Sequence, residues 1–174
     1  MTETGSRTVI DLEGWTALNG SGRRPEDADL RVIIDEEAVI ISETQVSRGR
    51  LLELVAKAEL TEITVFKRLS DGQFVEIGHE EVIDLCEPLI ESFHVGSRHH
   101  EYRFVLDGVD FTWPIRAITG LKLKHLAKVD PATYGVWEEI PGEDDRPIAD
   151  HQKVHLRREH AERFFTGKKG TTEG

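Results

Sequence analysis

The chain has 174 residues, a net charge of −11 and 38% apolar residues, which fits one ordinary domain or two small ones. The excess of acid disfavours non-specific nucleic-acid binding, because such binding depends on neutralising phosphates with Lys and Arg. No apolar run reaches the roughly 18 residues that a membrane span needs, and the polar N-terminus lacks the apolar core of a signal peptide. We therefore expect a cytoplasmic protein that binds neither nucleic acid nor membrane.

Residues 1–29 are rich in Gly, Ser, Thr and acidic side chains, a composition typical of a flexible segment. The segment nevertheless contains apolar side chains, among them Ile10, Leu12 and Trp15. Two alternatives follow for these side chains: a docking segment for a partner, or an extra strand laid on the module that comes next.

An internal repeat begins after this segment. Residues 31–35 and 103–107 are short β-branched or aromatic runs, each ending at an aspartate, and they lie 72 positions apart. Each run is followed by a turn and a second apolar run, at residues 38–41 and 109–113. Two such runs joined by a tight turn are typical of a β-hairpin. The repeat therefore predicts one hairpin in each half of the chain.

An amphipathic helix of about ten residues follows each predicted hairpin. Ser47 and Thr119 suit the N-cap position, because their side-chain oxygens can accept a backbone N–H of the first turn. The two helices repeat the i, i+3, i+4 spacing of apolar side chains, with Leu51, Leu54 and Val55 in the first and Leu123, Leu126 and Ala127 in the second.

The strands that follow the helices repeat with an offset of 71. They are predicted at residues 63–66 and 134–137, around Ile77 and Ile148, at 83–85 and 154–156, and at 91–95 and 162–166. A mixed sheet covered by one helix is an α+β unit that buries a core with few residues. We therefore predict two tandem modules, residues 30–96 and 101–166, joined by a linker at 97–100. Trp113 and Trp137 fall on strands and are predicted core residues.

The second module resembles the bacterial multi-ubiquitin family, whose β-grasp repeats are encoded beside ubiquitin-type activating, conjugating and deconjugating enzymes. The resemblance spans residues 101–166 in the family's order, with motifs at 102–108, Trp113-Pro114, 118–120, 126–127, 134–137, 144–148 and 162–165. The first module resembles the family less closely. It has Ile41-Ser42 in place of Trp113-Pro114, and Ser92 in place of Arg163.

This resemblance implies a ubiquitin-like β-grasp fold and a modifier function in a bacterial ubiquitination-like pathway. The carboxylate of Gly174 would be adenylated, passed to an enzyme cysteine and then to an amine or hydroxyl of an unknown target protein. The implied partners are a ubiquitin-type activating enzyme, a conjugating enzyme and a metallopeptidase of the JAB type. Neighbours of the family suggest a role in antiphage defence.

The same resemblance makes residues 167–174 a flexible conjugation tail with no large apolar side chain. A terminal glycine has no Cβ, so its carboxylate can enter a narrow cleft. Because Glu173 rather than a second glycine precedes Gly174, trimming to Gly170 or Gly167 before activation is an alternative.

Three lysines on the second helix, Lys122, Lys124 and Lys128, are candidate acceptors for a further modifier; the alternative is an ordinary solvated helix face. Cys86 lies in an apolar stretch among acidic residues, and we expect a buried thiol with a raised pKa.

The sequence contains no phosphate loop and no nucleophile framework, so we expect no enzymatic activity, no metal and no cofactor. Two other functions remain open. The chain could be a non-conjugated tandem β-grasp scaffold or adaptor that binds pathway partners, or a polyprotein that is cut between its modules near Gly96.

Overall fold

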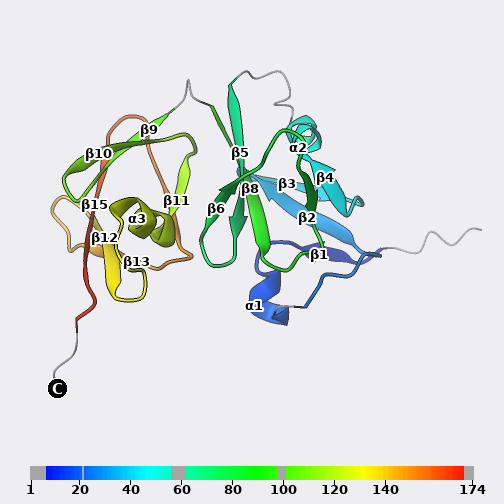
Figure 1. The fold of residues 1–174 in the computed structure, drawn as a ribbon, viewed down its shortest axis with the longest axis horizontal. Helices are drawn as coiled ribbons and strands as arrows, with labels where there is room; N and C mark the ends of the chain where they lie inside the picture. Colours follow the sequence, from blue (N-terminus) through cyan, green and yellow to red (C-terminus); the bar gives the residue numbers. More distant parts are fainter. Residues whose placement is uncertain (1–6, 21, 56–61, 98–100, 171–174) are drawn as a thin grey trace, which may run out of the picture. The chain divides into compact units, whose positions relative to one another are not determined.

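The computed structural model describes residues 7–20, 22–55, 62–97 and 101–170 and divides the chain into two compact units (Figure 1). The first unit comprises Met1–Ser70 and Val75–Val95, and the second comprises Asp71–Phe74 and Gly96–Gly174. Within the described residues, no helix is long and apolar enough to span a bilayer.

The first unit is a six-stranded mixed sheet with a separate two-stranded pair. Its elements are β1 (Val9–Asp11), α1 (Trp15–Asn19), β2 (Asp29–Ile34), β3 (Glu37–Ile41), β4 (Gln45–Ser47), α2 (Arg48–Leu54), β5 (Ile63–Leu69), β6 (Phe74–Glu76), β7 (Val82–Asp84) and β8 (Ile90–Ser97). The main sheet has the order β1-β2-β8-β5-β6, with β3 also paired to β2, and β4 pairs with β7.

The second unit repeats this arrangement, and its described residues include no counterpart of β1. Its elements are β9 (Tyr102–Leu106), β10 (Val109–Trp113), β11 (Ala117–Thr119), α3 (Gly120–Ala127), β12 (Tyr134–Glu139), β13 (Arg146–Ile148), β14 (Lys153–His155) and β15 (Glu162–Lys168). The main sheet has the order β10-β9-β15-β12-β13, and β11 pairs with β14. The predicted hairpins are both present, as β2–β3 and β9–β10.

The two predicted helix caps are confirmed. The Ser47 side chain accepts the N–H of Arg50 at 3.2 Å, and the Thr119 side chain accepts the N–H of Lys122 at 3.2 Å. In both places the cap satisfies one of the free N–H groups of the first turn. The described helices have seven and eight residues, shorter than the ten predicted.

Two short strands were not predicted: β4 and β11, which directly precede the caps. Each pairs antiparallel with the short strand late in its unit, β7 or β14. Three residues between a hairpin and a helix carry too little pattern to identify as a strand, because only the distant partner gives them regular hydrogen bonds.

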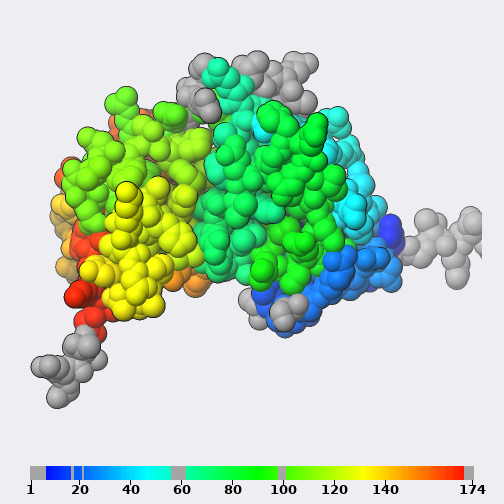
Figure 2. All heavy atoms as spheres, in the orientation of Figure 1, coloured from blue at the N-terminus to red at the C-terminus, as the bar shows by residue number. Residues whose placement is uncertain are grey.

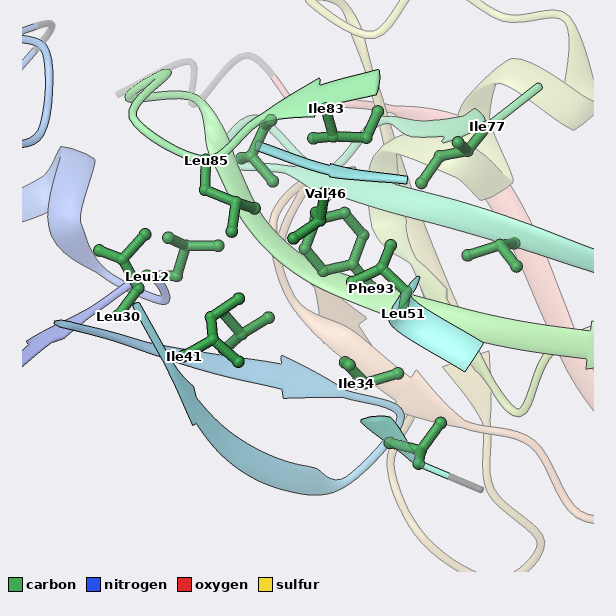
Figure 3. Close-up of a cluster of buried hydrophobic side chains, with 14 of the residues drawn as sticks. Leu12, Leu30, Ile34, Ile41, Val46, Leu51, Ile77, Ile83, Leu85 and Phe93 are labelled. Carbon is green, nitrogen blue, oxygen red and sulfur yellow. The ribbon is translucent and has the colours of Figure 1, made fainter. Parts of the chain in front are cut away.

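Apolar side chains from every layer fill the core of the first unit. Figure 3 shows Leu30 and Ile34 of β2, Leu51 of α2 and Phe93 of β8 pointing into one cluster, and each is fully buried. The predicted helix spacing therefore describes the face that packs on the sheet.

In the second unit, Phe104, Leu123, Val136 and Phe164 are the corresponding buried side chains. Trp113 is a core residue as predicted, with 7% of its surface exposed. The prediction that Trp137 is a core residue is wrong. Trp137 lies beside the buried Val136 and therefore faces the other side of the sheet, where it is partly exposed.

Residues 7–20 and 22–29 are folded onto the first unit, contrary to the flexible segment predicted for this region. Its strand β1 pairs in parallel with β2, in the register Val9↔Asp29, Ile10↔Leu30 and Asp11↔Arg31, which confirms the alternative of an added strand. Leu12, directly after β1, is fully buried in the core. The glycine-rich and acidic composition suggested flexibility, but a few apolar side chains are enough to dock the segment on an open sheet edge.

Arg24 holds this segment against the rest of the first unit, and only 1% of its surface is exposed. Its guanidinium donates to main-chain carbonyl oxygens on two sides, those of Leu12 (3.1 Å), Leu85 (3.1 Å), Pro88 (3.1 Å) and Ile90 (2.7 Å). Burial lowers the pKa of Arg24 to about 10, because it disfavours the charged form. The hydrogen bonds offset that cost and connect the start of the chain to the loop before β8.

We predict that Arg24→Met lowers the free energy of unfolding of the first unit by about 3 kcal/mol, because several buried carbonyls lose their donor. Urea unfolding, with hydrogen exchange of the peptides covering β1 and β2, measures the effect. Arg23→Met is the matched control. Arg23 is exposed and makes only surface ion pairs with Glu26 and Asp84, so we expect little change. Equal stability of the two variants would contradict the role of Arg24.

Candidate functional site

The C-terminal strand β15 lies in the middle of the second unit's sheet. It pairs in parallel with β9, from Glu162↔Phe104 to Phe164↔Leu106, and antiparallel with β12, from Tyr134↔Lys168 to Glu139↔Arg163. β15 has a strand on both sides at Glu162–Phe164, and from Phe165 to Lys168 it is paired with β12. Pairing with β12 therefore holds the backbone in the sheet as far as Lys168.

Asp107 clamps this strand near its end. The aspartate occupies the turn between β9 and β10 with φ of 50°, a left-handed conformation that Asp tolerates better than most residues. Its N–H donates to the carbonyl of Phe164 at 3.0 Å. Its two carboxylate oxygens accept the N–H and the hydroxyl of Thr166, each at 2.7 Å. The hairpin turn thus fixes the strand from which the C-terminal residues leave.

Asp35 makes the matching contact in the first unit. Its φ is 57°, its N–H donates to Phe93 O at 2.8 Å, and its carboxylate accepts the N–H of Val95 at 2.8 Å. The aspartate that ends each predicted strand is visible in the sequence. Its hydrogen bonds to a strand about 59 residues later cannot be read from the sequence, because they form only when the two segments meet in the folded unit.

Gly167 belongs to β15, which corrects the predicted tail boundary. It pairs with Gly135 across the sheet, and Lys169 donates its N–H to Thr133 O at 2.9 Å. The glycine content predicted a flexible tail from residue 167, but the main chain of a glycine can form sheet hydrogen bonds like that of any other residue. A chain trimmed to Gly167 would carry its carboxylate within the sheet. Gly167 is therefore a poor candidate for the reactive residue.

Gly170 has the surroundings expected of a reactive terminus. It is exposed, and a Cβ placed on it would meet no described heavy atom within 4 Å. In the space-filling view, the last described residues lie on the surface of the second unit, in red (Figure 2). Gly174, the preferred conjugation residue, lies outside the described residues.

The three candidate acceptor lysines on α3 have different surroundings. Lys124 is buried, forms an ion pair with Asp150 and donates to Pro131 O at 3.2 Å, which argues against it as an acceptor. Lys122 is partly buried, with its ammonium 5.2 Å from the centre of the Trp113 ring, and burial lowers its pKa. Lys128 ends the helix in a left-handed conformation and is exposed.

Cys86 is fully buried in the first unit, as predicted. Burial raises the pKa of its thiol, and the nearby Asp84 carboxylate adds to this effect. A buried thiol of this kind is a poor nucleophile at neutral pH. Among the residues that the structure describes, no three His, Cys, Asp or Glu side chains gather as a metal site.

The fold defines the class of protein. A hairpin, one helix packed on the sheet, and a last strand that returns to the centre beside the first strand make an α+β, ubiquitin-like β-grasp module, and the chain contains two in tandem. Residues 102–169, in the second unit, match the family described as multiubiquitin. The match ends at Lys169, whose N–H donates to Thr133 O just before β12. No curated protein matches the chain.

We predict that the clamp controls access to β15. Trypsin should cut the wild type quickly after the exposed Lys169 and slowly after Arg163, which lies within β15. Asp107→Gly removes the carboxylate without straining a left-handed turn, and losing two charge-assisted hydrogen bonds costs about 2 kcal/mol. Cleavage after Arg163 should then accelerate by up to about 30-fold, as measured by mass spectrometry of the fragments. The matched variant Asp35→Gly should leave this cut unchanged, and acceleration in both variants would count against a local clamp.

We predict that a limiting amount of an acetylating reagent at pH 8 modifies Lys128 and Lys122 before Lys124. Burial and the ion pair with Asp150 keep the Lys124 amine out of the reagent's reach. Peptide mass spectrometry after short exposure gives the order. Asp150→Asn is the control variant and should expose Lys124 to acetylation; early modification of Lys124 in the wild type would refute this assignment.

Proposed function

We propose that the chain is a ubiquitin-like protein modifier whose C-terminal glycine carboxylate is activated and transferred in a bacterial ubiquitination-like pathway. The observation that carries this proposal is the second unit: a module that matches the multiubiquitin family, whose last strand is held through Lys169 and followed by the exposed Gly170. A folded module followed by a short segment without large apolar side chains suits an enzyme that draws a carboxylate into its active site. Gly174 is the proposed reactive residue, with Gly170 as the alternative after trimming.

The proposed chemistry is one adenylation followed by three acyl transfers. The glycine carboxylate attacks the α-phosphorus of ATP on a ubiquitin-type activating enzyme, and pyrophosphate leaves. A cysteine thiolate of the enzyme then attacks the acyl adenylate, and AMP leaves. After passage to a conjugating enzyme, an amine or hydroxyl of the target attacks the thioester and releases the thiol. The modifier contributes no catalytic group and needs no cofactor of its own.

The other proposed partners follow from the same scheme. A metallopeptidase of the JAB type would trim the tail or release the target, working on the exposed chain after Lys169. The target protein and the link to antiphage defence belong to the proposal as well, with a cytoplasmic setting.

A non-conjugated scaffold is the second candidate, and one observation favours it. The first unit carries an N-terminal strand and the buried Arg24, which the second unit lacks, so the two units are not interchangeable copies. Such specialisation suits a unit that binds a different partner.

The test is intact mass spectrometry of the chain incubated with the cognate activating enzyme and ATP, beside a variant that lacks Gly174. We expect an adenylate or thioester adduct on the intact chain and none on the deletion variant. An adduct that forms only after shortening to Gly170 would move the reactive residue there. If no adduct forms while the enzyme still binds, the modifier proposal fails and the scaffold is favoured.

A further inference from the structure

Strand β3 forms an open edge of the first unit's main sheet, since it pairs with β2 and with no other strand in the described chain. Residues of an antiparallel pair alternate between hydrogen-bonded and non-bonded positions. Arg31 of β2 bonds away from β3, because its carbonyl accepts the N–H of Leu12 at 3.0 Å, and its partner in register is Ile40. Ile40 and Ala38, two residues earlier, therefore turn their N–H and C=O groups toward the open edge. Within the described residues, neither has a main-chain hydrogen bond outside the β2–β3 ladder.

The side chains of β3 are apolar on both faces of the sheet. Val39 is partly buried against the core, and Ile41 has only 5% of its surface exposed. On the opposite face, Ala38 is exposed and Ile40 has 59% of its surface exposed. The partly exposed Ile33 of β2 lies opposite Ala38 and extends this outer apolar surface. A β-branched strand with an open edge and no Pro or Lys readily pairs with another strand.

Two other edges, both in the second unit, are protected against such pairing. Strand β10 corresponds to β3 in the repeat, and it has Asp110 and Thr112 where β3 has Ala38 and Ile40. Strand β13 contains Pro147, which has no N–H to donate. Charged side chains and prolines are common means by which edge strands avoid pairing with other chains. β3 has neither at its outward positions.

We propose that β3 is the surface through which two copies of this chain form a dimer, with the two β3 strands antiparallel about a twofold axis. The partner strand must itself be an unprotected apolar edge, and β3 of a second copy is one. With Val39 at the centre, Ala38 of each copy lies opposite Ile40 of the other, and each of these pairs exchanges both of its main-chain hydrogen bonds. Glu37 then lies opposite Ile41, so no like charges face each other. This inference adds to either proposed function and depends on neither.

The size of the contact and the charge of the chain set the strength of the dimer. A contact of about five residues a side is far smaller than the roughly 20–30 residues a side of stable complexes, so we expect a weak and reversible dimer. Each copy carries a net charge of −11, and the two copies therefore repel each other. Salt screens that repulsion but leaves apolar contacts and main-chain hydrogen bonds intact. Dimerisation should accordingly strengthen with salt, whereas an association held by ion pairs should weaken.

Sedimentation equilibrium of the full chain, from about 10 μM to about 1 mM, tests the proposal. The weight-average mass of the wild type should rise with concentration toward twice that of one chain, and the rise should begin at a lower concentration when salt is added. Ile40→Lys places a charge in the apolar contact, and Ala38→Pro removes an outward N–H without breaking a bond to β2. Each substitution should raise the dissociation constant of the dimer by about tenfold or more.

Thr112→Lys is the matched control, because it places the same residue at the corresponding position of β10, and it should leave the dimer unchanged. Amide hydrogen exchange, followed by NMR, locates the contact in the wild type. The N–H groups of Ala38 and Ile40 should exchange more slowly in a concentrated sample than in a dilute one. The N–H of Val39 already bonds to β2, so its exchange should change little.

Several results would overturn this dimer contact. One is a wild type that stays monomeric over the whole concentration range. Another is a dimer that neither substitution weakens, or one whose slowed amides lie outside β3. A dimer that dissociates when salt is added would also overturn it. Circular dichroism checks that both variants are folded; if Ala38→Pro is not, Ile40→Lys and the exchange of the wild-type amides decide the question.

Discussion

The return of the last strand to the centre of the sheet is the constraint on which the second unit depends. β15 supplies hydrogen bonds to both β9 and β12, so neither half of the sheet is complete until the last residues of the unit are in place. Asp107 reinforces this from the other end of the sequence by holding Thr166 with both carboxylate oxygens. The folding of the sheet therefore fixes the position of the described chain as far as Lys169.

The first unit meets the same constraint in a different way. Its last strand β8 pairs with β2 at a single position, Ile34↔Phe93, whereas β15 pairs with β9 over three. Strand β1 takes the rest of that edge of β2, and Arg24 binds the segment to the loop before β8 through main-chain carbonyls. An N-terminal segment thus replaces part of the pairing that the C-terminal strand provides in the second unit. The repeat preserved the fold while the two units acquired different surfaces.

The surroundings of individual side chains decide which of them a partner or a reagent can reach. The lysines of α3 differ because Lys124 is buried and paired with Asp150, whereas Lys128 is exposed at the helix end. On the main sheet of the second unit, the paired glycines Gly135 and Gly167 leave room for the Trp137 indole to lie across β12 and β15. The surface at the end of β15 is therefore set by residues that lie far apart in the sequence.

The sequence by itself determined the repeat, the two hairpins, both helix caps and the α+β class, because each depends on local periodicity or on one side chain bonding to the next turn. It also pointed to the burial of Cys86 and of the core leucines. The tertiary structure alone decided which glycine is free, since Gly167 and Gly170 look alike in composition but only Gly167 has a partner strand. It likewise decided that Trp137 faces outward, that Lys124 is buried and that Arg24 secures the N-terminal segment. The physical reason is the same in each case: hydrogen bonds and burial at these positions come from residues distant in sequence, and no local pattern records them.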